Sequence, residues 1–201
     1  REYVVMCAVH TIMEARADLD FARILNNAAL RLPDGMPLVW LSSRFTRRTV
    51  ERIRGIDLLR ALCARSPETG HKHFFYGGTP GVAEDLHKET IRLYPGAQVV
   101  GIRTPGHLQI GQVEDSSIID EINRSGADIL WIGLGCPKQE WWIASHRMQL
   151  HVPVIIGIGA AFNFHSGHLA EAPTLLRDHG LEWLYRLYQE PRRLAKRYAT
   201  T

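Results

Sequence analysis

The sequence of 201 residues has little cysteine, no long hydrophobic run and no strong charge of either sign. Its three cysteines, Cys7, Cys63 and Cys136, are far apart and odd in number. They form neither a disulfide framework nor a zinc pattern, which suits a reducing cytosol. The longest apolar run, residues 152–162, is too short and too glycine-rich to span a bilayer. No signal peptide is evident, although the chain starts at Arg1, close to an expected strand, so we expect the natural protein to begin earlier.

The composition, with 45% hydrophobic and 22% charged residues, is that of a soluble globular protein. The chain is long enough for one domain with a sizeable core. A formal net charge of +3 argues against a dedicated nucleic-acid-binding protein. Positive charge is concentrated near the end of the chain, where one acidic residue, Glu190, stands among Arg186, Arg192, Arg193, Lys196 and Arg197.

Short apolar runs alternate with segments of helical spacing along the whole chain. This alternation predicts an α/β fold with a mainly parallel sheet flanked by helices. No internal repeat is evident. The expected strands cover residues 3–9, 30–33, 73–76, 97–102, 129–132 and 153–158. The expected helices cover residues 13–27, 37–43, 55–65, 82–94, 114–124, 137–150 and 181–188.

Residues 127–142 predict a buried strand, a glycine turn and the start of a helix. Gly135 allows the backbone to turn sharply and to approach a ligand closely. Pro137 suits the first position of the helix, whose free N–H groups attract anions, phosphates above all. Lys138 and Gln139 add a cation and an amide there. The pattern is neither a dinucleotide fingerprint nor a Walker A loop, so an ordinary strand-to-helix connection stays the alternative.

Asp34 follows the second expected strand, in a turn before the helix that Pro37 opens. It would lie at the carboxyl edge of the sheet, where open α/β folds bind ligands. An aspartate at this place also suits a helix cap. Position alone leaves capping and chemistry open.

Several other polar groups allow both a structural and a functional interpretation. Asp18 and Asp20 match the D-x-D pattern of metal-dependent glycosyltransferases, but we interpret them as the solvated side of a helix. His165 and His168 lack a third candidate ligand, so we interpret them as a loop pair rather than a metal site. A basic cluster is interpreted mainly as an exposed loop, with one or two members facing a phosphate; it contains Arg44, Arg47, Arg48, Arg52 and Arg54.

The last expected helix carries Trp183 and Tyr185 and leads into the basic end of the chain. One interpretation is a terminal helix packed on the core. The other is a basic, aromatic segment that contacts an anionic membrane surface. The two interpretations are compatible.

Motifs from almost the whole chain form a specific combination. They are residues 32–37 (LPDGMP), 52–57 (RIRGID), 75–78 (FYGG), 94–96 (YPG), 133–140 (GLGCPKQE), 157–159 (GIG) with Phe162, 172–173 (AP), and 180–187 (GLEWLYRL) with 190–191 (EP). In this order they resemble the WecG/TagA/CpsF family of bacterial glycosyltransferases, glycosyltransferase family 26.

The resemblance implies a Rossmann-like core at residues 1–176 and a short basic helical appendage at residues 177–201. It implies an inverting enzyme that needs neither metal nor cofactor. The implied donor is a UDP-sugar, typically UDP-N-acetylmannosamine or its uronic acid. The implied acceptor is N-acetylglucosamine linked through diphosphate to undecaprenol, in the synthesis of teichoic acid, common antigen, capsule or exopolysaccharide. Members are cytoplasmic and peripheral to the inner face of the plasma membrane, and a homo-oligomer is left open.

The same resemblance makes Asp34 the catalytic base, which takes a proton from the acceptor hydroxyl. Without metal, the departing diphosphate needs other positive charge, which Arg52, Lys138, the helix start and the basic C-terminal run would supply. The residues expected to bind substrate are Arg52, Gly135, Pro137, Lys138, Gln139, Glu140, Asn163, Arg186, Arg192 and Arg193.

Three positions depart from the family pattern. Ala8 stands where the family usually has asparagine, Asn163 where it commonly has aspartate, and Glu171 where it commonly has arginine. Ala8 motivates a second hypothesis, a non-catalytic protein that binds nucleotide-sugars. The incomplete glycine fingerprint argues against a third, a nicotinamide- or SAM-dependent Rossmann enzyme.

Overall fold

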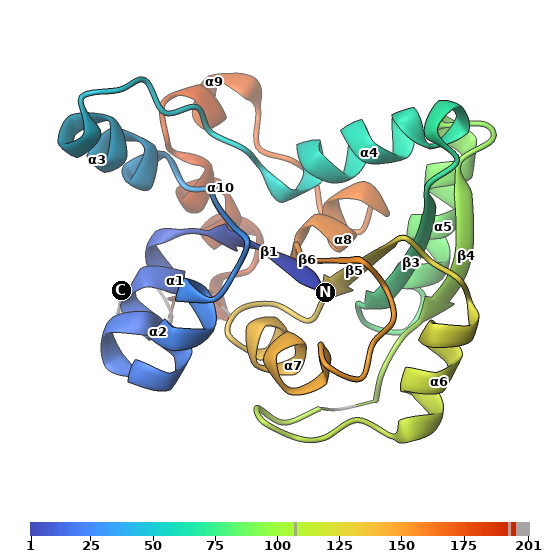
Figure 1. Cartoon of the computed structure of the whole chain (residues 1–201). Coiled ribbons are helices and arrows are strands. Elements are labelled where there is room, and N and C mark those ends of the chain that lie inside the picture. Colours follow the sequence, from blue (N-terminus) through green and yellow to red (C-terminus); the bar gives the residue numbers. More distant parts are fainter. Residues whose placement is uncertain (107, 193, 196–201) are drawn as a thin grey trace.

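A computed structural model describes residues 1–106, 108–192 and 194–195 (Figure 1). The strands described there form one sheet, in the order β2-β1-β6-β5-β3-β4, and every neighbouring pair is parallel. The predicted α/β fold with a parallel sheet is therefore confirmed. The strands are β1 (Glu2–Cys7), β2 (Leu30–Pro33), β3 (Lys72–Gly77), β4 (Gln98–Arg103), β5 (Ile129–Gly133) and β6 (Val154–Gly157).

Helices cover both faces of the sheet (Figure 1). The helices are α1 (Val9–Ala17), α2 (Leu19–Asn26), α3 (Met36–Thr46), α4 (Gly55–Thr69), α5 (Val82–Leu93), α6 (Ser116–Arg124), α7 (Lys138–His146), α8 (Ala161–His165), α9 (Thr174–Asp178) and α10 (Glu182–Gln189). Helices α2, α6 and α7 pack on one face, and α4, α5 and α8 on the other.

The core consists of two apolar layers, one on each face of the sheet. Along β5, Leu130 and Ile132 belong to one layer, and Ile129 and Trp131 to the other. Because helices bury both faces, the central strands are continuous apolar runs without polar alternation. The indole of Trp131 donates a hydrogen bond to Nδ1 of His73 at 3.0 Å, which satisfies a polar group inside the core.

The first expected helix is wrong, because two helices stand in its place. Val9 already opens α1, so the first strand ends at Cys7 rather than at Val9. The Asp18 carboxylate accepts hydrogen bonds from the backbone N–H groups of Asp20 and Phe21 and thereby caps α2. Asp18 is therefore a helix cap and not the solvated side of a continuous helix.

Other boundaries also differ from the sequence prediction. Helix α7 ends at His146 instead of about residue 150, since the chain turns at Arg147. Helix α4 extends to Thr69, past its internal Pro67. Helices α8 and α9 were not expected, because five residues are too few to show a helical period.

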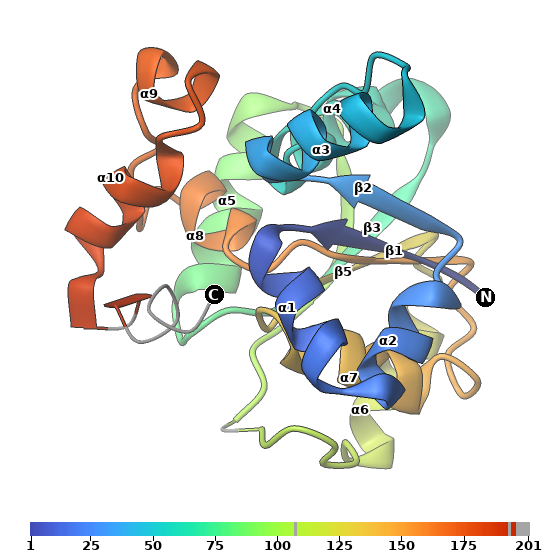
Figure 2. The same ribbon diagram turned by 90° about the vertical axis from the view of Figure 1, so that its left-hand side faces the viewer.

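Helices α9 and α10 stand at the end of the sheet toward which the strands run (Figure 2). The boundary expected at residues 176 and 177 falls inside α9, and the division into core and appendage stays a prediction. Across the described ranges, none of the helices combines the length and the apolar character that crossing a membrane requires.

Candidate active site

A cleft of about 1280 Å³ opens at the carboxyl ends of the strands, where the strand-to-helix loops meet α10. The loops after β1, β2, β3, β5 and β6 all line it. This is the edge at which open α/β sheets bind ligands. Of the residues expected to act at the site, those on its lining are Asp34, Arg52, Gly135, Pro137, Lys138, Gln139, Asn163 and Arg186.

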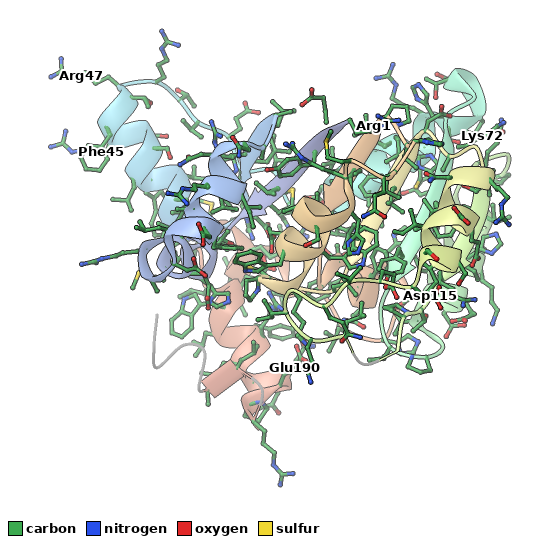
Figure 3. All side chains as sticks on the ribbon, turned by 60° about the horizontal axis from the view of Figure 1, so that its bottom comes forward. Arg1, Phe45, Arg47, Lys72, Asp115 and Glu190 are labelled. Carbon is green, nitrogen blue, oxygen red and sulfur yellow. The ribbon has the colours of Figure 1, made fainter. Side chains whose placement is uncertain are left out.

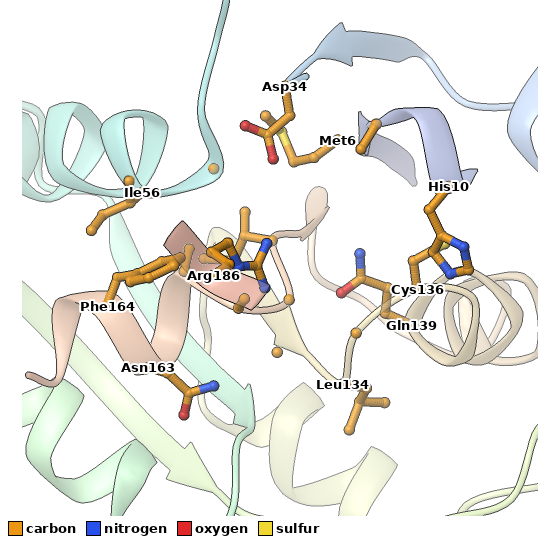
Figure 4. A pocket seen from close by; sticks show the side chains of 18 of the residues that line it. Met6, His10, Asp34, Ile56, Leu134, Cys136, Gln139, Asn163, Phe164 and Arg186 are labelled. Carbon is orange, nitrogen blue, oxygen red and sulfur yellow. The ribbon is translucent and has the colours of Figure 1, made fainter. Parts of the chain in front are cut away.

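Asp34 is placed by the end of β2. Its backbone N–H donates to the carbonyl of Cys7 at 2.8 Å, which ties the turn to β1. The N-cap of α3 is Gly35, with no side-chain capping bond, so the capping role left open for Asp34 is not observed. Figure 4 shows the carboxylate pointing into the cleft.

Arg52 connects Asp34 to the last helix. Its Nε donates to the backbone carbonyl of Asp34, and one terminal nitrogen lies 3.9 Å from the Asp34 carboxylate. The same nitrogen lies 2.7 Å from the carboxylate of Glu182 at the start of α10. Arg52 therefore has its charge partly neutralised by Glu182, which weakens its expected role as a diphosphate ligand.

Burial raises the pKa of Asp34 from 3.8 to about 6. The positive charges of Arg52, Arg186 and Arg54 oppose that rise, and the negative charge of Glu182 adds to it. The side chain is 37% exposed, so a ligand can reach it. At neutral pH this carboxylate is ionised and more basic than an ordinary aspartate.

Arg186 reaches the cleft from α10. Its guanidinium carbon lies 5.5 Å from the centre of the Phe164 ring, a cation–π contact that holds the side chain over the cavity. Its buried Nε has no hydrogen-bond partner within the described part of the chain. Figure 4 shows Arg186, Asp34 and Gln139 directed toward the same space from different elements.

The loop between β5 and α7 forms another wall of the cleft. Gly135 has a φ of +80°, a conformation that favours glycine, and a side chain added there would meet open space. Pro137 is the N-cap of α7 rather than its first residue, a difference of one position. The ammonium of Lys138 donates to the carbonyl of Leu108 at 3.1 Å, so its positive charge stays available.

Gln139 lines the cleft, whereas Glu140 lies beneath its surface. Gln139 is only 3% exposed, and its Oε1 has no hydrogen-bond partner among the described residues. Its amide nitrogen donates to Oε1 of Glu140 at 2.8 Å. Glu140 is fully buried and is not among the residues that line the cleft, and burial raises its pKa. Glu140 thus holds Gln139 from beneath instead of facing a ligand.

The remaining expected residues lie apart. Arg192 is exposed and is not among the residues that line the cleft. Arg193 lies outside the described residues. The basic cluster is divided by the fold: Arg44 is in α3 and points outward, whereas Arg54 lines the cleft.

The model of the Glycosyl transferase WecG/TagA/CpsF family matches residues 1–201. The chain belongs to this family. Membership confirms the resemblance and makes the protein a glycosyltransferase.

Two curated relatives are each named N-acetylglucosaminyldiphosphoundecaprenol N-acetyl-beta-D-mannosaminyltransferase. The relative from Bacillus spizizenii (strain ATCC 23059 / NRRL B-14472 / W23) is 30% identical over 181 residues, which cover 90% of this chain and 68% of the relative. The relative from Bacillus subtilis (strain 168) is 29% identical over 175 residues, which cover 87% of this chain and 66% of the relative. The chain thus spans about two thirds of their length.

Among solved structures, unliganded arylmalonate decarboxylase aligns with 87% of this chain and 96% of its own, at 13% identity and a TM-score of 0.32. A similarity this weak supports no statement about function.

Glu171, one of the departures from the family pattern, contacts several arginines. Glu171 is hydrogen-bonded by Arg54, and it lies 2.7 Å from Arg60 and 3.1 Å from Arg177. Burial raises the pKa of Glu171, but the hydrogen bonds and positive charges of Arg54 and Arg60 outweigh it and hold that pKa below its usual range. In this member of the family, a carboxylate at position 171 therefore joins α4 to the segment that leads into α9.

Sequence reasoning did not single out Glu182 as a site residue. It belongs to a family motif, but its partner Arg52 is 130 residues away, and no local pattern connects them. His168, interpreted from the sequence as part of a loop pair, lines the cleft, and its Nε2 lies 3.0 Å from the Asp85 carboxylate on α5.

Over the described ranges, no group of three or more histidine, cysteine, aspartate or glutamate residues is arranged to hold a metal ion. His165 is buried and stacks on Tyr94, with ring centres 6.3 Å apart. His165 and His168 therefore have separate surroundings.

Proposed function

We propose that this glycosyltransferase moves an N-acetylmannosamine-type sugar from a UDP-sugar to a polyprenyl-diphosphate-linked N-acetylglucosamine, with inversion and without a metal. The observation that carries the proposal is the cleft-facing carboxylate of Asp34, with its pKa raised to about 6, opposite the glycine loop of α7. The names of the two relatives support the sugar and the acceptor.

In the proposed reaction Asp34 takes the proton of the attacking acceptor hydroxyl. The acceptor oxygen forms a bond to the anomeric carbon on one face, and the bond from that carbon to the diphosphate oxygen breaks on the other. UDP leaves with the electron pair of the broken bond, and Asp34 becomes a neutral acid. A carboxylate with a pKa near the working pH is well suited to this transfer.

The departing diphosphate gains negative charge and needs cations and N–H donors in place of a metal. Arg186 and Lys138 are the cleft residues best suited to this role. The guanidinium of Arg186 extends into the cavity, and Lys138 donates only to a neutral carbonyl. The unpartnered Oε1 of Gln139 suits a hydroxyl of the sugar or ribose.

The proposed partners are the UDP-sugar, the lipid-linked acceptor and the anionic inner face of the plasma membrane, to which a cytoplasmic protein would bind peripherally. The second candidate, a non-catalytic nucleotide-sugar-binding protein, is favoured only by Ala8, which lines the cleft in place of the asparagine usual in the family.

The test is transfer from a panel of UDP-sugars to a short-chain polyprenyl-diphosphate-N-acetylglucosamine, with EDTA present. We expect product from one donor, with inverted anomeric configuration. UDP binding by calorimetry without product from any donor would favour the binding protein. Product that forms only after a divalent metal is restored would overturn metal independence.

A further inference from the structure

Helix α3 and the two residues that follow it carry a set of side chains that the proposed reaction does not use. We call this set the α3 face: Trp40, Leu41, Arg44, Phe45, Arg47 and Arg48. Trp40, Leu41 and Phe45 are 54%, 52% and 81% exposed, although such large apolar side chains are usually buried. The three arginines are exposed and form no ion pair with any described residue.

The spacing of these residues places them together. Positions 40, 41, 44 and 45 recur at three- and four-residue intervals, which put side chains on one side of a helix, and Arg48 follows just after the end of α3. Val39, on the other side, is buried. Arg47 adopts a left-handed conformation with a φ of 54° and ends the helix. Figure 3 shows Phe45 and Arg47 at the tip of α3, away from the sheet.

The charge of the α3 face has one sign. The sequence holds no acidic residue between Asp34 and Glu51, so nothing on this segment offsets the arginines. Exposed aromatic and aliphatic side chains among uncompensated arginines are typical of a helix that lies in the headgroup region of an anionic membrane.

The α3 face is continuous with the mouth of the cleft. Met36 and Pro37, in the first turn of α3, line the cleft. Trp40 also packs closely on the backbone of Gly180, which precedes α10. A Cβ added at Gly180 would lie 2.8 Å from Cη2 of the indole. Trp183 on α10 is 47% exposed and also lines the cleft. A surface bound to the α3 face would therefore lie beside the opening.

We propose that the α3 face docks on an anionic lipid bilayer, with Leu41 and Phe45 entering the headgroup region and the arginines binding lipid phosphates. A second copy of the chain fits less well, because a symmetric contact of this face would place the arginines of both copies together. This inference rests on the proposed function in one respect: the lipid-linked acceptor of the proposed reaction is the reason why a bilayer would be near.

The test is flotation of the whole chain with vesicles of phosphatidylglycerol and phosphatidylcholine, and with vesicles of phosphatidylcholine alone. We expect binding to the anionic vesicles only. Replacing Arg44, Arg47 and Arg48 by glutamine should weaken it on the order of a hundredfold at low salt. Leu41→Ser with Phe45→Ser should weaken it by roughly tenfold or more, because membrane binding scales with the apolar area that is buried.

Matched control variants lie elsewhere on the surface. Leu19 and Met148 are each 75% exposed, so Leu19→Ser with Met148→Ser removes similar apolar area far from α3. Replacing Arg65, Arg92 and Arg124 by glutamine removes the same formal charge from other exposed positions. We expect both controls to bind vesicles like the wild type.

Two results would overturn the proposal. One is that the α3 variants and the control variants bind anionic vesicles equally well, whether both lose binding or neither does. The other is a dimer in sedimentation velocity that Phe45→Ser dissociates, which would assign the face to a second copy. Turnover of a water-soluble, short-chain acceptor should be unchanged in the α3 variants; if even the wild type lacks turnover, the proposed function fails while the vesicle result still stands.

Discussion

At the scale of single residues, Asp34 has the features of a base that works near neutral pH. Burial and Glu182 disfavour its ionised form, while Arg52 favours it, and the pKa settles at about 6. An ordinary aspartate would be a weaker base by about two pKa units. The same residue is ionised above pH 6, so that it can accept a proton.

We predict that Asp34→Asn lowers transfer by about 10²- to 10⁴-fold, because asparagine cannot accept the proton. Burial raises the pKa of Asp34 in the folded state, so ionisation of this group costs stability as the pH rises through about 6. Asparagine removes that cost. Urea unfolding at pH 8 should show the variant more stable by about 1 kcal/mol, a value reduced for solvent screening because the side chain is 37% exposed.

The stability gain of Asp34→Asn should vanish below about pH 4, where the wild-type carboxyl is protonated in both the folded and the unfolded state. Near-normal turnover of this variant would remove Asp34 from the mechanism.

Glu182 is the residue that we expect to adjust this base. Glu182→Gln removes a negative charge that raises the pKa of Asp34 and releases Arg52 toward it. The acid limb of the pH profile of kcat/KM should then move to lower pH, on the order of one unit.

Glu171→Gln is the matched control for Glu182→Gln, since Glu171 also binds arginines at the base of α9 but does not act directly on Asp34. It should move the acid limb less than Glu182→Gln does, because Glu171 affects Asp34 only through Arg54, the weakest of the charges that shift the pKa of Asp34. If the acid limb stays unchanged in Glu182→Gln while circular dichroism shows intact folding, Glu182 does not adjust the pKa of Asp34.

At the scale of elements, the carboxyl ends of β3 and β5 approach each other too closely for side chains. Gly77 has a φ of +135°, and a Cβ added there would lie 2.6 Å from the backbone carbon of Gly133. Gly133 in turn leaves room for the ring of Phe162. Because Gly133 lines the cleft, this close packing of the two backbones shapes the wall of the cleft.

We predict that Gly77→Ala lowers the free energy of unfolding by about 3 kcal/mol or more, because the methyl group meets backbone that cannot move aside. Gly70→Ala serves as the comparison. Gly70 also has a positive φ, +73°, but a side chain there meets open space. It should cost only about 1 kcal/mol, the strain of a left-handed alanine. Equal costs in urea titrations would contradict the close packing of β3 and β5.

At the scale of the whole molecule, arginines fasten the C-terminal segments across the cleft. Arg52 binds Glu182 on α10, and Arg54 binds Glu171 before α9. Arg186 then enters the cleft from α10. The last helix thus completes the candidate site instead of only packing on the core.

We predict that removing residues 192–201 weakens binding to anionic vesicles more than binding to UDP. This segment of the sequence carries Arg192, Arg193, Lys196 and Arg197, while the cleft residues stay in place. Vesicle flotation and calorimetry with UDP measure the two effects. A loss of similar size in both would indicate that the segment supports the nucleotide site.

The sequence by itself determined the order of strands and helices, the motifs that carry the family, and Asp34 at the carboxyl end of a strand. Such features depend on local periodicity and on residues near each other in the chain. The sequence pattern did not predict the short helices α8 and α9 or the break between helices at Asp18, because a helix cap or a single helical turn has almost no periodicity.

Only the tertiary structure decided which charges meet. Arg52 and Glu182 are 130 residues apart, and their contact depends on how α10 packs over the sheet edge. The burial of Glu140 beneath the cleft and the exposure of the α3 face follow likewise from packing. The pKa of Asp34 depends on the same arrangement, since desolvation and neighbouring charge are properties of the folded surroundings and not of the residue type.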